Sequence, residues 1–190
     1  MKRHTFALIL AACTTLLHGC QSKKEKAFQS SEGVREVVNR LTDAFGKTAY
    51  YTDITLSYVK GVGSTISATG TSDPTSTKLI SKLHSGGDWE DVSEVTLDLS
   101  GGAKPSDFLF TLDEVDQLKK VPEMVKVAIE KVKKEKNFDV VAEHVSVKYP
   151  SRRMGPDDGL GFDVNLAPEN GGTSFIAVFD GKGNYQRMVY

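Results

Sequence analysis

The chain has 190 residues, and its 24 basic side chains nearly balance its 25 acidic ones, for a formal net charge of −1 at pH 7. This length fits one domain or two small ones, and a hydrophobic fraction of 39% is ordinary for a globular protein, which excludes a wholly disordered chain and a multi-pass membrane protein. A near-neutral charge lacks the positive field that non-specific nucleic-acid binding needs, so we expect no nucleic-acid partner.

The first twenty residues have the order of a secretory leader. Lys2 and Arg3 make a positive start, and a mostly apolar stretch follows at residues 6–17. This stretch is shorter than the roughly 20 residues that a membrane-spanning helix needs. It ends in Leu17-His18-Gly19-Cys20, which resembles the lipobox of bacterial lipoproteins: an aliphatic residue, a variable position, a small residue and then the cysteine.

The resemblance covers residues 1–20 and implies how the chain is processed. In this class, the leader 1–19 is removed and the thiol of Cys20 carries lipid, so the membrane becomes a partner through that lipid. Residue 21 is Gln rather than Asp, which implies sorting to the outer membrane in lipoproteins of the enterobacterial kind. We therefore expect a lipid-anchored outer-membrane protein with its body in the periplasm.

Processing would also remove most of the thiol chemistry. Residues 20–190 carry a formal charge of −3, since only Lys2 and Arg3 leave among the charged residues. Cys13 would leave with the leader, and the sulfur of Cys20 would be used by the lipid. No thiol would then remain for a disulfide, a nucleophile or a zinc site, and we assign no catalytic residue, metal ligand or cofactor.

The body is expected at residues 31–190, after a lipidated cysteine and flexible tether at residues 20–30. A helix is predicted over residues 31–45, with Ser30 or Ser31 as its N-cap and Gly46 just after its end. Its apolar side chains recur at helical spacing and form one stripe: Val34, Val37, Val38, Leu41 and Phe45.

Strand patterns follow this helix. Residues 49–59 and 64–71 read as a hairpin, and residues 92–99 as a further strand, while residues 79–83 fit either a helical turn or a strand. In the first strand, two sets of side chains alternate along the chain: Tyr50, Thr52, Ile54, Leu56 and Tyr58 against Tyr51, Asp53, Thr55 and Ser57.

The second half repeats this order of elements. Thr111 and Glu114 have the spacing of a capping box that opens a short helix, and Pro122 starts a longer one that ends near Asn137. Strands are predicted over residues 138–149, 160–166, 173–180 and 185–190. In the first of these, the alternating apolar positions are Val141, Val145, Val147 and Tyr149.

Helices followed by runs of strands predict an α+β fold. We expect antiparallel sheet or sheets with the two main helices packed on one face. The order also fits two tandem helix-then-strands units, at residues 31–105 and 106–190, although no residue-level repeat is visible.

The most suggestive local cluster runs from His84 to Asp91. It combines a histidine, the paired Gly86 and Gly87, the only tryptophan and three carboxylates. We interpret it as a loop before a strand, with Trp89 packing at the edge of the domain; a partner-binding surface is the alternative, since tryptophan is enriched at interface hot spots. The candidate partner-binding residues are His84, Asp88, Trp89, Glu90 and Asp91.

Other polar positions have simpler interpretations. His144 is expected to be structural or exposed on its strand, and Asp180–Asn184 to form a hairpin turn rather than a calcium loop. The loop at residues 150–159 is expected to be solvated, with Arg152 and Arg153 near acidic neighbours.

These observations favour a non-enzymatic binding or scaffold module on a lipid anchor. An inhibitor or immunity protein against a toxin or hydrolase is the alternative, with contacts around Trp89 and residues 86–91. An enzyme whose residues converge through folding is the least favoured hypothesis.

Overall fold

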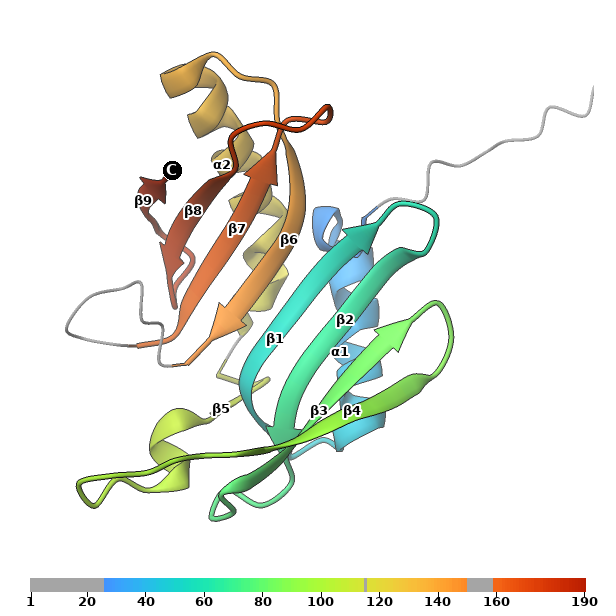
Figure 1. Ribbon diagram of the computed structural model, residues 1–190, viewed down its shortest axis with the longest axis vertical. Helices are drawn as coiled ribbons and strands as arrows, with labels where there is room; N and C mark the ends of the chain where they lie inside the picture. The colour runs from blue at the N-terminus through green and yellow to red at the C-terminus, as the bar shows by residue number, and fades with distance from the viewer. Residues whose placement is uncertain (1–25, 115, 150–158) are drawn as a thin grey trace, which may run out of the picture.

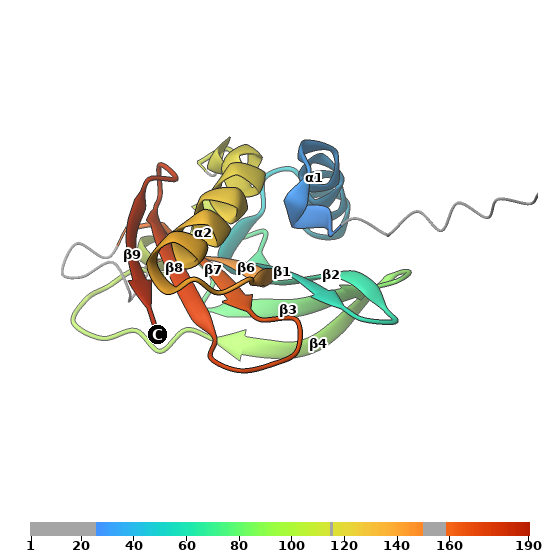
Figure 2. The same cartoon turned by 90° about the horizontal axis from the view of Figure 1, so that it is seen from above.

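The computed structural model describes residues 26–114, 116–149 and 159–190 as one α+β body. Within these ranges, nine strands form a single antiparallel sheet, and the two long helices lie on one of its faces (Figures 1 and 2). The α+β class, the antiparallel pairing and the placement of both helices on one face are therefore confirmed. Cys20 and the leader lie outside the described residues.

Helix α1, Ser31–Phe45, begins and ends where its sequence indicates. The Ser30 side chain accepts a hydrogen bond from the Gly33 amide at 3.2 Å, which satisfies one of the free amides of the first turn. Gly46 follows the last turn with φ of 91°, a backbone conformation that glycine adopts without a steric penalty. The apolar stripe buries Val34, Val37 and Leu41 against the sheet.

The first half of the sheet is a meander. Strands β1, Tyr50–Val59, and β2, Gly63–Thr71, form the expected hairpin. Strand β3, Lys78–Ser85, settles the open choice at residues 79–83 in favour of a strand. Strand β4, Trp89–Thr96, then forms one edge of the sheet, and nearly all of its residues are exposed.

The second half has the same order. The short strand β5, Phe110–Thr111, pairs with β1, and a 3₁₀ turn leads into helix α2, Val121–Lys136. Asn137 ends this helix in the left-handed conformation, as expected. A second meander follows, made of β6 (Val141–Lys148), β7 (Gly161–Ala167), β8 (Phe175–Asp180) and β9 (Tyr185–Val189).

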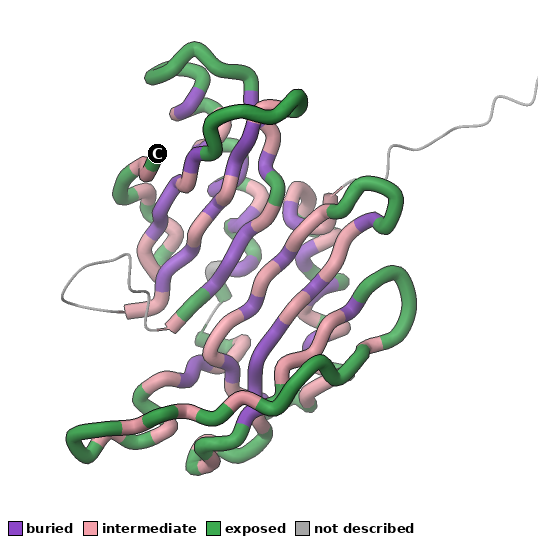
Figure 3. Tube along the Cα trace, viewed as in Figure 1, coloured by how far each residue is buried: buried purple, intermediate pink, exposed green. Residues whose placement is uncertain are grey.

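The two meanders join through their first strands. The spatial order is β4-β3-β2-β1-β6-β7-β8-β9, and β1 pairs antiparallel with β6. Each half is thus a helix followed by a four-stranded meander, which is the order of the two expected tandem units. One hydrophobic core includes residues of both helices and of strands from both meanders, and buried positions run along both halves of the sheet (Figure 3).

Two register shifts change which side chains point inward. The pairing of β1 shifts between Tyr51 and Asp53, so Tyr51 is fully buried, whereas Tyr50 is only partly buried. The pairing of β6 shifts between Ala142 and His144, so Ala142 takes the buried position instead of Val141. The regular alternation that the sequence predicts is therefore interrupted at these two strand starts, because one extra residue reverses it.

The body begins earlier than the sequence suggests. A 3₁₀ turn, Ala27–Gln29, precedes α1, and Phe28 is 0% exposed within the hydrophobic core. The Lys26 ammonium donates to the Ala142 carbonyl at 2.7 Å and lies over the Tyr58 ring. Residues 26–30, which the sequence places in the flexible tether, are therefore joined to the body through the buried Phe28, and the turn contacts α1, α2 and β1.

Candidate functional site

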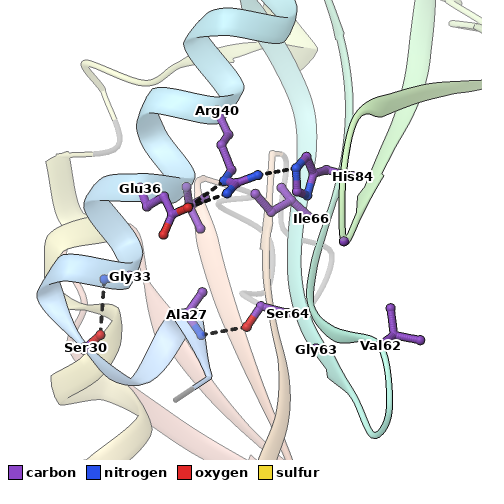
Figure 4. Close-up of a pocket in the computed structure, with 13 residues that line it drawn as sticks. Ala27, Ser30, Gly33, Glu36, Arg40, Val62, Gly63, Ser64, Ile66 and His84 are labelled. Carbon is purple, nitrogen blue, oxygen red and sulfur yellow. Dashed lines mark hydrogen bonds and ion pairs between the residues drawn. The ribbon is translucent and has the colours of Figure 1, made fainter. Parts of the chain in front are cut away.

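A groove of about 490 Å³ lies beside α1, near the point where the described chain begins. Helix α1 forms one wall, and the β1–β2 turn and the β3–β4 turn form the other (Figure 4). We call this cavity the α1 groove. Its volume falls in the range of small-molecule sites, about 300–1,000 Å³.

One face of α1 supplies the groove wall. Gly33, Glu36, Val37 and Arg40 recur every three or four residues, so their side chains lie above one another along the helix. Val37 is buried at the base of the wall, whereas Glu36 and Arg40 reach the surface. The groove therefore has an apolar floor and a charged rim.

Arg40 connects α1 to the sheet across this groove. Its Nε donates to Glu36 Oε1 at 3.0 Å, its Nη2 also donates to that oxygen, and its Nη1 donates to Nε2 of His84 (Figure 4). His84 lies near the end of β3 and is only 6% exposed. The network Glu36–Arg40–His84 thus connects α1 to β3. Arg40 and His84 are 44 positions apart in the sequence.

The Arg40 contact is compatible only with a neutral imidazole at His84. An arginine has only donors, so Nε2 must accept and the neutral imidazole carries its proton on Nδ1. Burial lowers the pKa of His84, and the positive charge of Arg40 lowers it further, against smaller opposing effects of the Gly87 backbone and Glu36. Nδ1 is buried and makes no well-formed hydrogen bond within the described part of the chain.

The opposite wall consists of backbone and small side chains. The Ser64 hydroxyl accepts a hydrogen bond from the Ala27 amide at 3.0 Å, which ties the start of the body to β2. Gly86 and Gly87 make the β3–β4 turn, and a side-chain atom added at Gly87 would meet nothing within 4 Å. The groove is therefore open at this turn.

Trp89 and the acidic residues lie differently from the expectation. Residues 89–91 belong to strand β4 rather than to a loop, because Trp89 pairs with His84 and the turn is confined to residues 86–88. The Trp89 ring packs edge-on against His84 and Phe45, with centroids 5.4 and 6.0 Å apart. Trp89 thus packs at the edge of the domain, as expected. Its ring contacts and supports His84.

The three carboxylates of the cluster do not converge on His84. Asp88, Glu90 and Asp91 are all exposed, and Asp91 forms an ion pair with Lys82 at 2.6 Å. The carboxylate that does join the histidine network is Glu36, through Arg40. Sequence reasoning missed both residues of α1: their i, i+4 spacing indicates a helical ion pair, but no local signal connects them to His84.

No protein-family model matches the chain, and searches of curated proteins and of solved structures found no match. The site is therefore interpreted from its own geometry.

The remaining sequence candidates are separate from the groove. His144 lies on β6 opposite Ser57 and Asn165, and burial lowers its pKa. Asp180 accepts the amides of Lys182 and Asn184, both at 2.9 Å, which confirms the hairpin turn. Of the loop at residues 150–159, positions 150–158 lie outside the described residues, together with Arg152 and Arg153.

Two further properties concern only the described ranges. Within residues 26–114, 116–149 and 159–190, no three histidine, cysteine or acidic side chains come together as metal ligands would. In the same part of the chain, no helix is long and apolar enough to cross a membrane.

Proposed function

We propose that this protein is a bacterial outer-membrane lipoprotein with a non-enzymatic binding module as its body. The lipobox-like segment ending at Cys20 supports the anchor, and the α1 groove supports the binding role. The anchor would confine the body near one membrane and so raise its effective concentration for partners there.

The observation that carries the binding role is the combination of an open groove with a fixed polar network. Glu36 and His84 hold the Arg40 guanidinium in one position, and a prearranged donor group loses little freedom when a ligand arrives. Val37 and Ile66 provide buried apolar surface beside it. The groove therefore suits a small ligand or a chain segment that has both an apolar part and a hydrogen-bond acceptor.

The same network argues for binding rather than catalysis. A general base needs a free lone pair within reach of substrate, but the Nε2 lone pair of His84 already accepts from Arg40. Within the described part of the chain, the carboxylate that the hydrogen bonds connect to His84 is Glu36, through the neutralising guanidinium of Arg40. We infer that His84 positions Arg40 and does not transfer protons.

Acyl labelling of the native protein tests the anchor. Cells that express the full chain and take up a labelled fatty acid should label the wild type and place it in the membrane fraction. The variant Cys20→Ala should lose both properties. A Cys20→Ala protein that stays labelled and membrane-bound would refute the anchor.

Filling the groove tests the binding role. Gly87 has an unrestricted backbone and open space around its Cα, so Gly87→Phe should occlude the groove without unfolding the body. We would crosslink the lipidated protein in its own envelope and compare Gly87→Phe with Ser72→Phe, an exposed position in the β2–β3 turn. A partner retained equally by both variants would exclude the groove as its site.

An inhibitor or immunity protein is the second candidate, because of strand β4. This strand lies at the edge of the sheet and carries Asp88 beside it and Glu90 on it, both exposed. A basic strand of a toxin or hydrolase could pair with such an edge. Replacing both acids, as Asp88→Lys and Glu90→Lys, should then abolish binding while Gly87→Phe leaves it unchanged.

A further inference from the structure

We propose that the β1–β2 turn contacts the lipid bilayer and inserts into the interface between headgroups and acyl chains. The turn consists of Val59, Lys60, Gly61 and Val62, and we call it the valine turn. This inference rests on the proposed lipid anchor at Cys20 and adds an orientation for the body.

The first step is the position of the tether. The body starts at Lys26, which is fixed to the Ala142 carbonyl, and at Ala27, whose amide donates to Ser64. Ser64 is the second residue of β2, directly after the valine turn. The chain that leads to the anchor therefore leaves the body beside this turn.

The second step is the length of that chain. Only residues 21–25 separate Cys20 from Lys26, and six peptide units span at most about 22 Å in any conformation. An anchored body cannot move further than this from the bilayer at its Lys26 end. The valine turn thus stays within reach of the headgroups.

The third step is the chemistry of the turn. Val59 and Val62 are 46% and 47% exposed, among the most exposed large apolar side chains in the described residues. A hydrogen bond from the Val62 amide to the Val59 carbonyl closes the turn at 3.1 Å, and Gly61 takes φ of 89°. The turn presents two valines with Lys60 between them, and a lysine can extend its ammonium towards phosphate while its stem lies in apolar surroundings.

The other end of β2 shows the contrast. There the β2–β3 turn, residues 72–77, has the sequence SDPTST and carries no exposed large apolar side chain. It lies about 30 Å from the valine turn along the nine residues of β2. Of the two turns that flank β2, the turn beside the tether therefore carries two exposed large apolar side chains and the far turn carries none.

A depth measurement on the lipidated protein tests this orientation. Val62→Cys and Ser72→Cys each add one labelling site for an environment-sensitive dye, and an acylated Cys20 does not react. The proteins are placed in vesicles of phosphatidylethanolamine with a minority of phosphatidylglycerol that carry a nitroxide lipid quencher. We expect blue-shifted, strongly quenched emission at position 62 and water-like, unquenched emission at position 72.

Two matched substitutions sharpen the test. Val59→Ser in the Val62→Cys protein should reduce the quenching, because a more polar turn inserts less. Ile80→Ser removes an apolar side chain of similar exposure, 42%, on β3 and should leave the quenching unchanged.

Other outcomes would overturn the inference. Water-like emission at position 62 on vesicle-bound protein would do so. Disulfide-linked dimers of the unlabelled Val62→Cys protein would also overturn it, because they would mean that a second copy covers the turn. Failure of the anchor itself gives a different result: the protein would stay off the vesicles and Cys20 would take up dye.

Discussion

Arg40 on α1 donates a hydrogen bond to Nε2 of His84 on β3, and this contact joins the helix to the first meander across the α1 groove. The acceptor role of Nε2 requires a neutral imidazole, because a protonated ring would present an N–H to the guanidinium. The charge state of one buried histidine is thus linked to the contact between α1 and β3.

Acid should therefore destabilise the protein. The pKa of His84 is lowered in the folded state, so the unfolded chain, with a pKa near 6.5, binds more protons between the two values. The contribution of the neutral His84 to the free energy of unfolding should be fully present above about pH 7. It should fall as the pH drops through about 6.5. Urea titrations between pH 7.5 and 5 would measure it.

The variant His84→Gln is the control for this dependence. It should reduce the slope of stability against pH but not remove it, because burial also lowers the pKa of His144. An unchanged slope in His84→Gln would show that His84 does not carry the effect.

The two charges of α1 should move the pKa of His84 in opposite directions. Arg40→Gln removes a positive neighbour and should raise that pKa, although not to its ordinary value, because burial is the larger cause. Glu36→Gln removes a negative neighbour and should lower it. Proton NMR titration of the His84 ring in both variants measures the shifts, and two shifts of the same sign would contradict the network.

The sequence predicted the elements whose signals are local. The stripe from Val34 to Phe45 and the caps Ser30 and Gly46 defined α1, because helix periodicity and capping depend on residues within a few positions. The β1–β2 hairpin and the turn at Asp180 were found for the same reason. Local chemistry was therefore sufficient for the fold class.

Local chemistry was not sufficient where contacts between distant segments decide the structure. The shift between Tyr51 and Asp53 depends on how β1 pairs with its neighbours, which the alternation of one strand does not encode. Phe28 was assigned to a tether because one aromatic residue in a polar run has no periodicity. Arg40 and His84 met only through packing of α1 on the sheet, so half of the candidate site was not visible in the sequence.

Gly33→Ala should destabilise the protein, although the same change within a helix usually stabilises it by about 0.5–1 kcal/mol. A Cβ at Gly33 would overlap the Ala27 carbonyl oxygen and approach its Cα to 2.8 Å. The 3₁₀ turn at Ala27–Gln29 would have to move, and Phe28 with it. Thermal unfolding should show a lower Tm, with Gly87→Ala as a neutral control because its Cβ meets nothing.

Phe28→Ala should cost about 3–5 kcal/mol in the free energy of unfolding, the usual range for a buried phenylalanine. Phe28 is fully buried in the core, so its removal leaves a cavity beside α1 and β1. Phe138→Ala is the matched control: this ring is 49% exposed and should cost about 1 kcal/mol or less. Equal costs in urea unfolding would mean that residues 26–30 do not belong to the core.

Trp89 should act through stability rather than as an exposed contact residue. Its ring packs against Phe45 and His84 but is only partly buried, so Trp89→Ala should lower the free energy of unfolding by about 3 kcal/mol, the low end for a tryptophan, and loosen the Arg40–His84 contact. Asp88→Asn and Glu90→Gln change exposed side chains and should stay within about 0.5 kcal/mol. Because Trp89 is the only tryptophan, circular dichroism should follow the unfolding. A stable Trp89→Ala protein with an unchanged pKa for His84 would instead make Trp89 available as a partner-binding residue.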